Sequence, residues 1–542
     1  MKKIRKKSGD LAATGISTSA LFQPVQVKQT IFSEDGIELV HLWSCGEGIE
    51  ICKDDEENVF HVWLPENHKN SSHRVVTFAS SDGKLLTKHT FDDCDDFHDG
   101  LLCVYTEGKG YGYIDRNGKL AIPPQYEETQ DFHNNYAAVK KDGQWLLIDR
   151  EGKELALQRS YRQFGIMENG RCPASTVHFE SDDFAYHSNY ACDAGWWGYV
   201  AENGKEVIPP QYIYATDFQN GLAVVCKGKW TKSPKWDNEH RKGKYWFEEA
   251  RWGVIDPDGN EVIPCQYDKI ETFSATESQD IFKVHTGGWE HGRWGVMDKQ
   301  GRWIAPPVFD ELGYDYQDGY FIFFPDLDIE KKENTAANNT ALYRMQGVFE
   351  VKTQTVLFEF PEIEILQNGL FRVTKITANG KITQHILDRT GKEMFSSDYR
   401  TIHYATTPHK VCKENGSEKL WGLIDPDGTV ILPCEYHFPL SLAFWEYSST
   451  IFMKDGKFGA VGADGRILLP AKYHQLDHLI EQWFRFETET GRMGIVSASG
   501  KIILSEKKEY VTINWDFHDH IIAVHDHGTD IFAIRKSETG RA

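Results

Sequence analysis

The sequence has no long apolar run and no paired cysteine motif, and it has few segments with helical periodicity. No stretch approaches the roughly 18–20 consecutive apolar residues of a membrane-spanning helix, so a helical membrane protein is excluded. Ten cysteines are present, but none forms the Cys-x-x-Cys pair that nucleates zinc or redox sites. We therefore expect free thiols and a cytoplasmic protein, because disulfides are rare in reducing compartments.

Basic residues are also scarce relative to acidic ones. The chain has 60 Lys and Arg against 81 Asp and Glu, a formal net charge of −21. This charge argues against nucleic acid or an anionic membrane as the main partner. No G-x-S-x-G, Walker or Gly-rich dinucleotide pattern stands between a strand and a helix. The sequence therefore predicts that the protein is not an enzyme and has no cofactor.

The chain does contain a fixed internal repeat, which determines the architecture. The segment WGVIDPDGNEVIP begins at Trp252 and returns, closely or loosely, from five other residues. These are Tyr111, Trp197, Trp294, Trp421 and Phe458. In every copy the glycine after the aromatic residue and the glycine of the turn are six residues apart. Constant spacing of this kind is typical of a half-buried hairpin, because a slip of one residue exposes its apolar face.

The repeat predicts a strand, a tight turn and a return strand. Side chains of residues 252–256 alternate between two faces, which is typical of a strand. Residues 256–259, Asp-Pro-Asp-Gly, favour a type I turn in which Gly259 has a positive φ and forms a G1 bulge. We expect Pro264 to end the return strand, because it has no N–H to donate.

Other repeated positions are assigned to structure. The glycine after the tryptophan is interpreted as a place where a neighbouring repeat approaches closely. The structural positions are Trp197, Gly198, Trp252, Gly253, Gly259, Trp294, Gly295, Trp421, Gly422 and Gly428. The recurring aspartates are assigned to hydrogen bonds within their turns, and not to a row of functional carboxylates. They are Asp115, Asp149, Asp256, Asp298, Asp388 and Asp425.

The pattern aromatic-Gly-x-Ile-Asp, x-x-Gly-Lys, Val-Ile-Pro and Tyr resembles the WG-repeat family of bacterial proteins. Residues 217–225, with Phe-Gln-Asn-Gly-Leu-Ala-Val-Val, are similar to another strand of that family. The resemblance covers about Phe60 to the C-terminus. It implies a repeat fold and no catalytic motif, because the family has none in common.

The expected fold is all-β. We predict a tandem array of about eleven antiparallel three-stranded units, elongated and twisted, over residues 66–542. Closure into a β-propeller is the alternative. It ranks second because a propeller blade usually has a fourth strand, whereas each unit of this sequence shows three. Residues 31–65 are expected to form an N-terminal cap. Residues 1–30 are expected to be a disordered basic tail, because no apolar signal-peptide core follows their lysines.

Three insertions fall between the first and second strands of their repeats, at residues 178–195, 227–251 and 325–343. Insertions at one topological position emerge on one side of a repeat array, often the binding side. Neutral growth of a tolerant loop is the alternative.

The second insertion, residues 227–251, differs from the rest of the chain in charge. It has eight basic and four acidic residues, a local charge of +4, and three tryptophans interleaved with them. Aromatic and basic residues are enriched at binding hot spots. The candidate partner-binding residues are Trp230, Lys235, Trp236, Arg241 and Trp246. Packing of the tryptophans onto their own hairpin is the alternative.

Two histidine pairs, His518 with His520 and His525 with His527, flank a short strand near the C-terminus. Alternate residues of a strand share a face, so each pair offers two metal ligands. About 23 Å of extended strand separates the pairs, too far to share one ion. We therefore favour imidazoles on an exposed terminal edge and predict no metal.

These features together predict a non-catalytic scaffold that binds a protein through loops on one side of the array. A binding module for a glycan or cell-envelope polymer is the alternative. The oligomeric state is left open.

Overall fold

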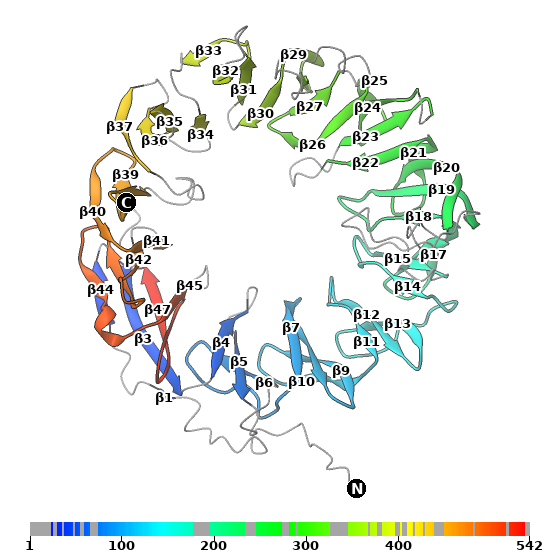
Figure 1. The fold of residues 1–542 in the computed structure, drawn as a ribbon. Coiled ribbons are helices and arrows are strands. Elements are labelled where there is room, and N and C mark those ends of the chain that lie inside the picture. The colour runs from blue at the N-terminus through cyan, green and yellow to red at the C-terminus, as the bar shows by residue number, and fades with distance from the viewer. Residues whose placement is uncertain are drawn as a thin grey trace.

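The computed structural model is a closed ring of twelve β-sheets (Figure 1). It describes residues 23–24, 30–34, 37–46, 49–54, 59–65, 74–176, 196–232, 245–273, 281–288, 291–325, 345–366, 369–376, 382–395, 401–403, 409–415, 418–425, 429–437, 449–480, 483–515 and 520–536. The ring is a twelve-bladed β-propeller. The prediction of an all-β fold is confirmed. The ring corresponds to the alternative architecture, a β-propeller, and the prediction of an elongated array is wrong.

The first six sheets, blades 1 to 6, follow one another along the chain. Blade 1 has β4 (Glu50–Lys53), β5 (Val59–Pro65) and β6 (Arg74–Ser80); blade 2 has β7 (Asp93–His98), β8 (Leu101–Thr106), β9 (Gly110–Asp115) and β10 (Leu120–Tyr126); blade 3 has β11 (Glu128–Thr129), β12 (Tyr136–Lys141) and β13 (Gln144–Asp149). Blade 4 has β14 (Gln163–Phe164), β15 (Arg171–Ser175), β16 (Trp197–Ala201) and β17 (Glu206–Tyr212); blade 5 has β18 (Tyr214–Ala215), β19 (Ala223–Lys232), β20 (Tyr245–Ile255) and β21 (Glu261–Tyr267); blade 6 has β22 (Lys269–Thr272), β23 (Ile281–Thr286), β24 (Arg293–Asp298) and β25 (Trp303–Phe309).

Blades 7 to 12 complete the circle. Blade 7 has β26 (Glu311–Gln317), β27 (Tyr320–Phe324), β28 (Gln346–Glu350) and β29 (Thr355–Phe360); blade 8 has β30 (Glu362–Leu366), β31 (Leu370–Ile376), β32 (Ile382–Asp388) and β33 (Glu393–Phe395); blade 9 has β34 (Thr401–His403), β35 (His409–Asn415), β36 (Glu418–Ile424) and β37 (Val430–Tyr436). Blade 10 has β38 (Ser449–Lys454), β39 (Lys457–Gly462) and β40 (Ile467–Tyr473); blade 11 has β41 (Gln475–Ile480), β42 (Trp483–Glu487), β43 (Met493–Ser497) and β44 (Ile502–Leu504). Blade 12 has β45 (Thr512–Trp515), β46 (His520–His525) and β47 (Gly528–Lys536) together with β1 (Gln23–Pro24), β2 (Thr30–Glu34) and β3 (Ile37–Gly46). One 3-10 turn, η6 (Glu506–Lys508), precedes blade 12. Within the described part of the chain, no helix has the length and apolar character needed to cross a membrane.

Most blades have four strands, and this corrects the three-stranded unit. The segment expected to be a connector after Tyr267 forms β22, the first strand of the next blade. Such first strands lie toward the centre of the ring, as β7, β22 and β30 do in Figure 1. Their two to seven residues give too short an alternation to be recognised in the sequence.

The alternation of the repeat buries both faces of a blade. In blade 5, Trp252 and Val254 pack with Ile270 and Phe282 of blade 6. Ile255, which belongs to the opposite face, packs with residues of blade 4 such as Trp197 and Tyr199. The hydrophobic core is therefore a series of layers between blades. The repeat tryptophans belong to these layers: Trp197, Trp252 and Trp421 are buried, and Trp294 is partly buried.

The predicted bulged turn is confirmed. The N–H of Gly259 donates to Asp256 O at 2.9 Å, and the N–H of Asp256 donates to Asn260 O at 3.0 Å. Gly259 has a φ of +84°. The Asp256 carboxylate accepts from the N–H groups of Asp258 and Asn260 at 3.0 and 2.8 Å. Four other aspartates bond their turns in the same way, at Asp115, Asp149, Asp298 and Asp388.

The glycine after the tryptophan is needed for a reason that differs from the expected one. A Cβ on Gly253 would lie 2.7 Å from the carbonyl oxygen of Ile263, which belongs to the return strand of the same blade. The return-strand carbonyl is likewise too close at Gly198, Gly295 and Gly422. The approach therefore comes from within the blade, and not from a neighbouring repeat. Gly428, the turn glycine of blade 9, lies outside the described residues.

The return strand does not end at its proline. β21 runs on to Tyr267, and its ladder with β20 shifts between Trp252 and Val254, so that Pro264 falls in an irregular part of the pairing. β21 is the outermost strand of blade 5, where a missing N–H is tolerated.

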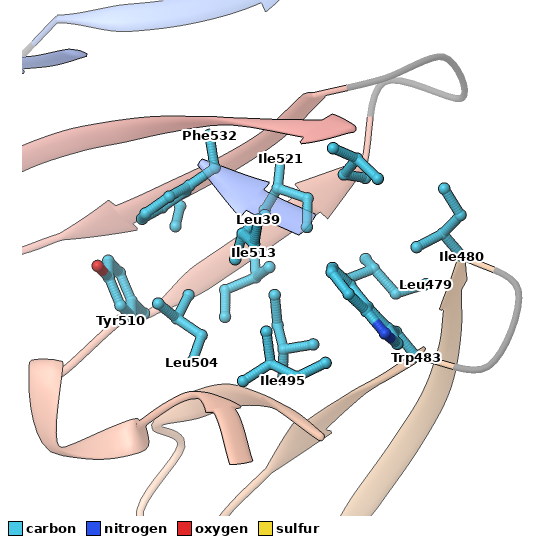
Figure 2. Packing of buried hydrophobic residues seen from close by; sticks show 13 residues of the cluster. Leu39, Leu479, Ile480, Trp483, Ile495, Leu504, Tyr510, Ile513, Ile521 and Phe532 are labelled. Carbon is cyan, nitrogen blue, oxygen red and sulfur yellow. The ribbon is translucent and has the colours of Figure 1, made fainter. Parts of the chain in front are cut away.

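The ring closes where the two ends of the chain meet. β3, near the N-terminus, pairs antiparallel with β47 in nine registered pairs, from Ile37–Lys536 to Gly46–Gly528. Leu39 then packs among Ile513, Ile521 and Phe532 (Figure 2). Residues 31–65, predicted to be a cap, contribute β2 to β5. Of the predicted tail, residues 1–22 and 25–29 lie outside the described residues.

Candidate functional site

The three insertions occupy one topological position, as the sequence predicted. They connect β15 to β16, β19 to β20, and β27 to β28, which are the second and third strands of their blades. Hairpins at this position in successive blades open toward the same side of the ring. We call this the insertion-bearing side.

The hairpin of blade 5 is longer than those beside it. β19 and β20 have 10 and 11 residues, whereas β15 and β16 have five each and β23 and β24 have six each. β18 pairs with β19 only at Val225 and Cys226, and β21 pairs with β20 only from Trp252 to Ile255. Among the described residues, 227–232 and 245–251 therefore have only each other as ladder partners. We call this two-stranded segment the ribbon.

The register of the ribbon brings two candidate tryptophans near each other along the backbone. Trp230 pairs with Phe247, and Trp246 pairs with Thr231, the next pair along. A register shift stands between Lys227 and Lys229, where Glu249 has a φ of +54°. A bulge of this kind increases the local twist and turns the outer part of the ribbon away from the blade.

Ion pairs at the base of the ribbon compensate part of its positive charge. Lys227 Nζ lies 2.6 Å from Glu261 Oε1, and Arg251 Nη1 lies 3.1 Å from Asp268 Oδ1. The hydrogen bond that Lys227 donates to the Glu261 carboxylate raises the pKa of Lys227. Lys229 pairs with Glu249 at 2.8 Å. The other basic residues of the insertion, from Lys232 to Lys244, stand between these positions in the sequence, and all but Lys232 lie outside the described residues.

The structure brings together only part of the candidate set. Trp230 and Trp246 lie on β19 and β20. Lys235, Trp236 and Arg241 lie outside the described residues. The choice between a binding role for the tryptophans and their packing on the hairpin stays a prediction.

The C-terminal histidines do not form one group on an exposed edge. His520 is 2% exposed, lies in β46 between β45 and β47, and meets Phe60 edge-on at 5.2 Å. His525 and His527 are adjacent at the far end of β46, with ring centroids 6.2 Å apart. His518 lies outside the described residues. The prediction of an exposed terminal edge is therefore wrong for His520, because β46 is an inner strand of blade 12 and Phe60 of blade 1 packs against the imidazole.

The cysteines agree with the expected free thiols where the structure describes them. Eight are free, at Cys52, Cys94, Cys103, Cys172, Cys226, Cys265, Cys412 and Cys434. Cys265 and Cys434, which each follow the proline of a return strand, pack against apolar clusters.

One group of metal-ligating side chains was missed by the sequence analysis. Asp54, His61 and Asp96 come together between blades 1 and 2. Their spacings of seven and 35 residues match no ligand motif, and only the ring topology makes them neighbours.

The comparisons with known proteins agree with the repeat. The model described as "WG containing repeat" matches residues 77–109, 111–145, 197–229, 252–275, 294–324 and 421–441. The architecture makes the chain a β-propeller, and these six matches make it a WG-repeat protein. A search of the curated proteins gives no significant match.

Solved structures show only distant likeness. A crystal structure of a eukaryotic initiation factor has 9% identity and a TM-score of 0.30, covering 66% of this chain and 89% of that one. The designed Ika8 protein has 11% identity and a TM-score of 0.20, covering 75% and 95%. BamB from Moraxella catarrhalis has 9% identity and a TM-score of 0.19, covering 90% and 99%. All three TM-scores are below 0.5.

Proposed function

We propose that this WG-repeat ring is a non-catalytic, cytoplasmic scaffold that binds a protein partner on its insertion-bearing side, with the ribbon as the main contact. The ribbon itself carries this proposal. Blade 4 and blade 6 form the same hairpin with strands about half as long, so the blade does not need the extension to fold. From Lys227 to Lys232 the extension reaches about 16 Å beyond the blade, at about 3.3 Å per residue.

The composition of the ribbon and its connecting segment suggests the chemistry of the partner. The ribbon and its tip carry a local charge of +4 on a chain with a net charge of −21. Ion pairs compensate Lys227, Lys229 and Arg251, so the other basic residues of the insertion are the ones proposed to contact the partner. An acidic protein surface with apolar pockets for tryptophan is complementary to such a segment.

The test compares two trimmed proteins. In the first, residues 230–246 are replaced by a short turn; in the second, residues 327–342 of the blade 7 insertion are replaced in the same way. The second is a matched control, because that insertion occupies the same topological position and contains no tryptophan. Both proteins should keep the melting temperature of the full chain, since loops outside the core tolerate such changes.

Affinity purification with mass spectrometry should then show that only the ribbon-trimmed protein loses its protein partners. The pair Trp230→Ala and Trp246→Ala should give a similar loss without shortening the chain. An unchanged partner set in the ribbon-trimmed protein would contradict the proposal. A fall of ten degrees or more in its melting temperature would show that the tryptophans belong to the core.

A glycan or cell-envelope polymer is the second candidate ligand, because three tryptophans in one insertion are also suited to stacking on sugars. It predicts retention on purified envelope polysaccharide that disappears when the ribbon is trimmed. Retention of proteins alone favours the scaffold.

A further inference from the structure

A cluster of metal-ligating groups lies where blade 1 meets blade 2. Asp54 directly follows β4, His61 lies on β5, and Asp96 lies on β7. One ligand atom from each lies within 4.8 Å of the other two. Asp54 and His61 are buried, with 0% and 4% exposure, while Asp96 is exposed and gives the cluster access to solvent.

The buried Nε2 of His61 faces this cluster and has no hydrogen-bond partner of good geometry among the described residues. Its ion-pair partner there is the Asp54 carboxylate. The nearest carboxylate oxygen, Asp54 Oδ2, is 3.4 Å away. Two ligands of a tetrahedral zinc ion, each about 2.0–2.1 Å from the metal, are about 3.4 Å apart. The separation therefore matches two ligands of one ion, and it is also the distance of a direct ion pair between His61 and Asp54.

Neighbouring groups hold both ligands in place. Asp54 Oδ2 accepts a hydrogen bond from the N–H of Phe97 at 2.8 Å. On the other side of the His61 ring, Nδ1 lies 3.7 Å from Cys94 Sγ. The ring of Phe78 meets the imidazole edge-on at 5.3 Å. Support of this kind fixes the orientation of a ligating histidine and carboxylate.

The position of His61 on the second strand of blade 1 differs from the corresponding position in three other blades. The corresponding residue of the second strand is a cation in blades 6, 8 and 11, where it forms an ion pair with the carboxylate directly opposite on the first strand. These pairs are Lys283–Glu271, Arg372–Glu364 and Asp477–Arg485. In blade 1 the residue opposite His61 is Cys52. Its carboxylates come instead from the end of β4 and from the next blade.

We propose that Asp54, His61 and Asp96 form a binding site for one divalent transition-metal ion, with Zn²⁺ as the preferred ion and water completing the coordination. A mixed imidazole and carboxylate set suits zinc, whereas Mg²⁺ prefers oxygen ligands alone. An ion held here joins the ends of two blades and strengthens the ring.

The test uses the full chain, freed of metal with a chelator and titrated with Zn²⁺ alone. Calorimetry should show one saturable tight site, and Zn²⁺ should raise the melting temperature, because an ion that binds only the folded state stabilises it. Asp96→Asn should weaken that site at least tenfold and abolish the thermal shift. Asp93→Asn is the matched control: it removes a charge from the same strand and should leave binding unchanged. Mg²⁺ should give no comparable site.

Two results would overturn the proposal. Absence of a saturable site in the full chain would mean that His61 and Asp54 form only an ion pair. Equal affinity in the Asp96→Asn and Asp93→Asn proteins would mean that zinc binds the acidic surface or other histidines. Because Asp96 is exposed, its amide variant should fold, and circular dichroism matching that of the full chain verifies this.

Discussion

Blade 5 and blade 12 are both antiparallel sheets, of four and six strands, but they are built in different ways. Blade 5 is contiguous, from Tyr214 to Tyr267, and contains the Trp-Gly motif and the Asp-Pro-Asp-Gly turn. Blade 12 takes β45 to β47 from one end of the chain and β3 from the other, and lacks the motif. The comparison shows that the motif specifies a hairpin locally, while closure of the ring depends on pairing between chain ends.

The polar chemistry of the two blades differs accordingly. Among the described residues, the carboxylate of Asp256 in blade 5 bonds only its own turn. Asp530 in blade 12 is 8% exposed and accepts hydrogen bonds from Ser44 Oγ at 2.6 Å and Tyr510 OH at 2.7 Å. His41 Nε2 lies 3.5 Å from the same carboxylate. A buried carboxylate thus joins strands from both ends of the chain.

Removing the N-terminal strand should give the largest effect. A chain that starts after Gly46 loses β3 and the buried side chains of Leu39, Val40 and Leu42. Loss of each such side chain costs about 2–5 kcal/mol, so we expect blade 12 to unfold and the melting temperature to fall sharply. Thermal unfolding followed by circular dichroism measures this. A chain that starts at residue 23 is the control, and equal stability of the two shortened proteins would show that closure contributes little.

Two glycines with the same backbone φ test whether the repeat turn packs closely against the preceding part of the chain. Gly204 and Gly221 both have a φ of +77°, so alanine strains the backbone equally at both. A Cβ at Gly204 would lie 2.6 Å from the carbonyl oxygen of Ala156 before the blade, whereas at Gly221 nothing lies within 4 Å. Overpacking costs about 1–3 kcal/mol, so Gly204→Ala should be less stable than Gly221→Ala by about that amount. Denaturant unfolding measures the difference, and equal values would refute close packing of the turn against the preceding chain.

Acid should weaken blade 12 through Asp530. Burial alone would raise the pKa of its carboxyl, but hydrogen bonds from His41, Ser44 and Tyr510 hold that pKa well below its usual range. The carboxylate therefore contributes stability that is present above its unfolded pKa of about 3.9 and is lost as the pH falls below that value.

Unfolding free energies measured from pH 6 to pH 2 test this dependence. Asp530→Asn should cost about 1–3 kcal/mol at pH 6 and less at pH 2, because at pH 2 the carboxyl of the unfolded chain is protonated and the native carboxylate loses most of its advantage. A cost that does not change with pH would mean that Asp530 acts only through its shape.

The smallest effect is expected on the ribbon. Lys229 and Glu249 form an ion pair with side chains 65% and 69% exposed. Exposed pairs contribute about 0–1 kcal/mol, so Lys229→Ala should leave thermal stability nearly unchanged. A larger loss would show that the ribbon packs against the ring, in contrast to its proposed role in binding.

The sequence predicted features that depend on neighbouring residues and missed those that depend on distant ones. The turn at Asp256, the positive φ of Gly259 and the positions of the insertions follow from local chemistry. The pairing of β3 with β47 joins residues about 490 apart and leaves no periodic signal. The site at Asp54, His61 and Asp96 was missed for the same reason, because it forms only when two blades stand side by side.

A single cross-link tests ring closure most directly. Cys45 pairs with Thr529 between β3 and β47. Paired residues of antiparallel strands have Cα atoms about 4.5–5.5 Å apart, a distance that a disulfide can span. In Thr529→Cys, mild oxidation followed by protease cleavage within residues 326–344 should leave two fragments that stay together until a reductant is added. The unsubstituted chain is the control for its native cysteines. If the fragments of the oxidised variant separate in denaturant without a reductant, the result would contradict the closed ring and favour the open array.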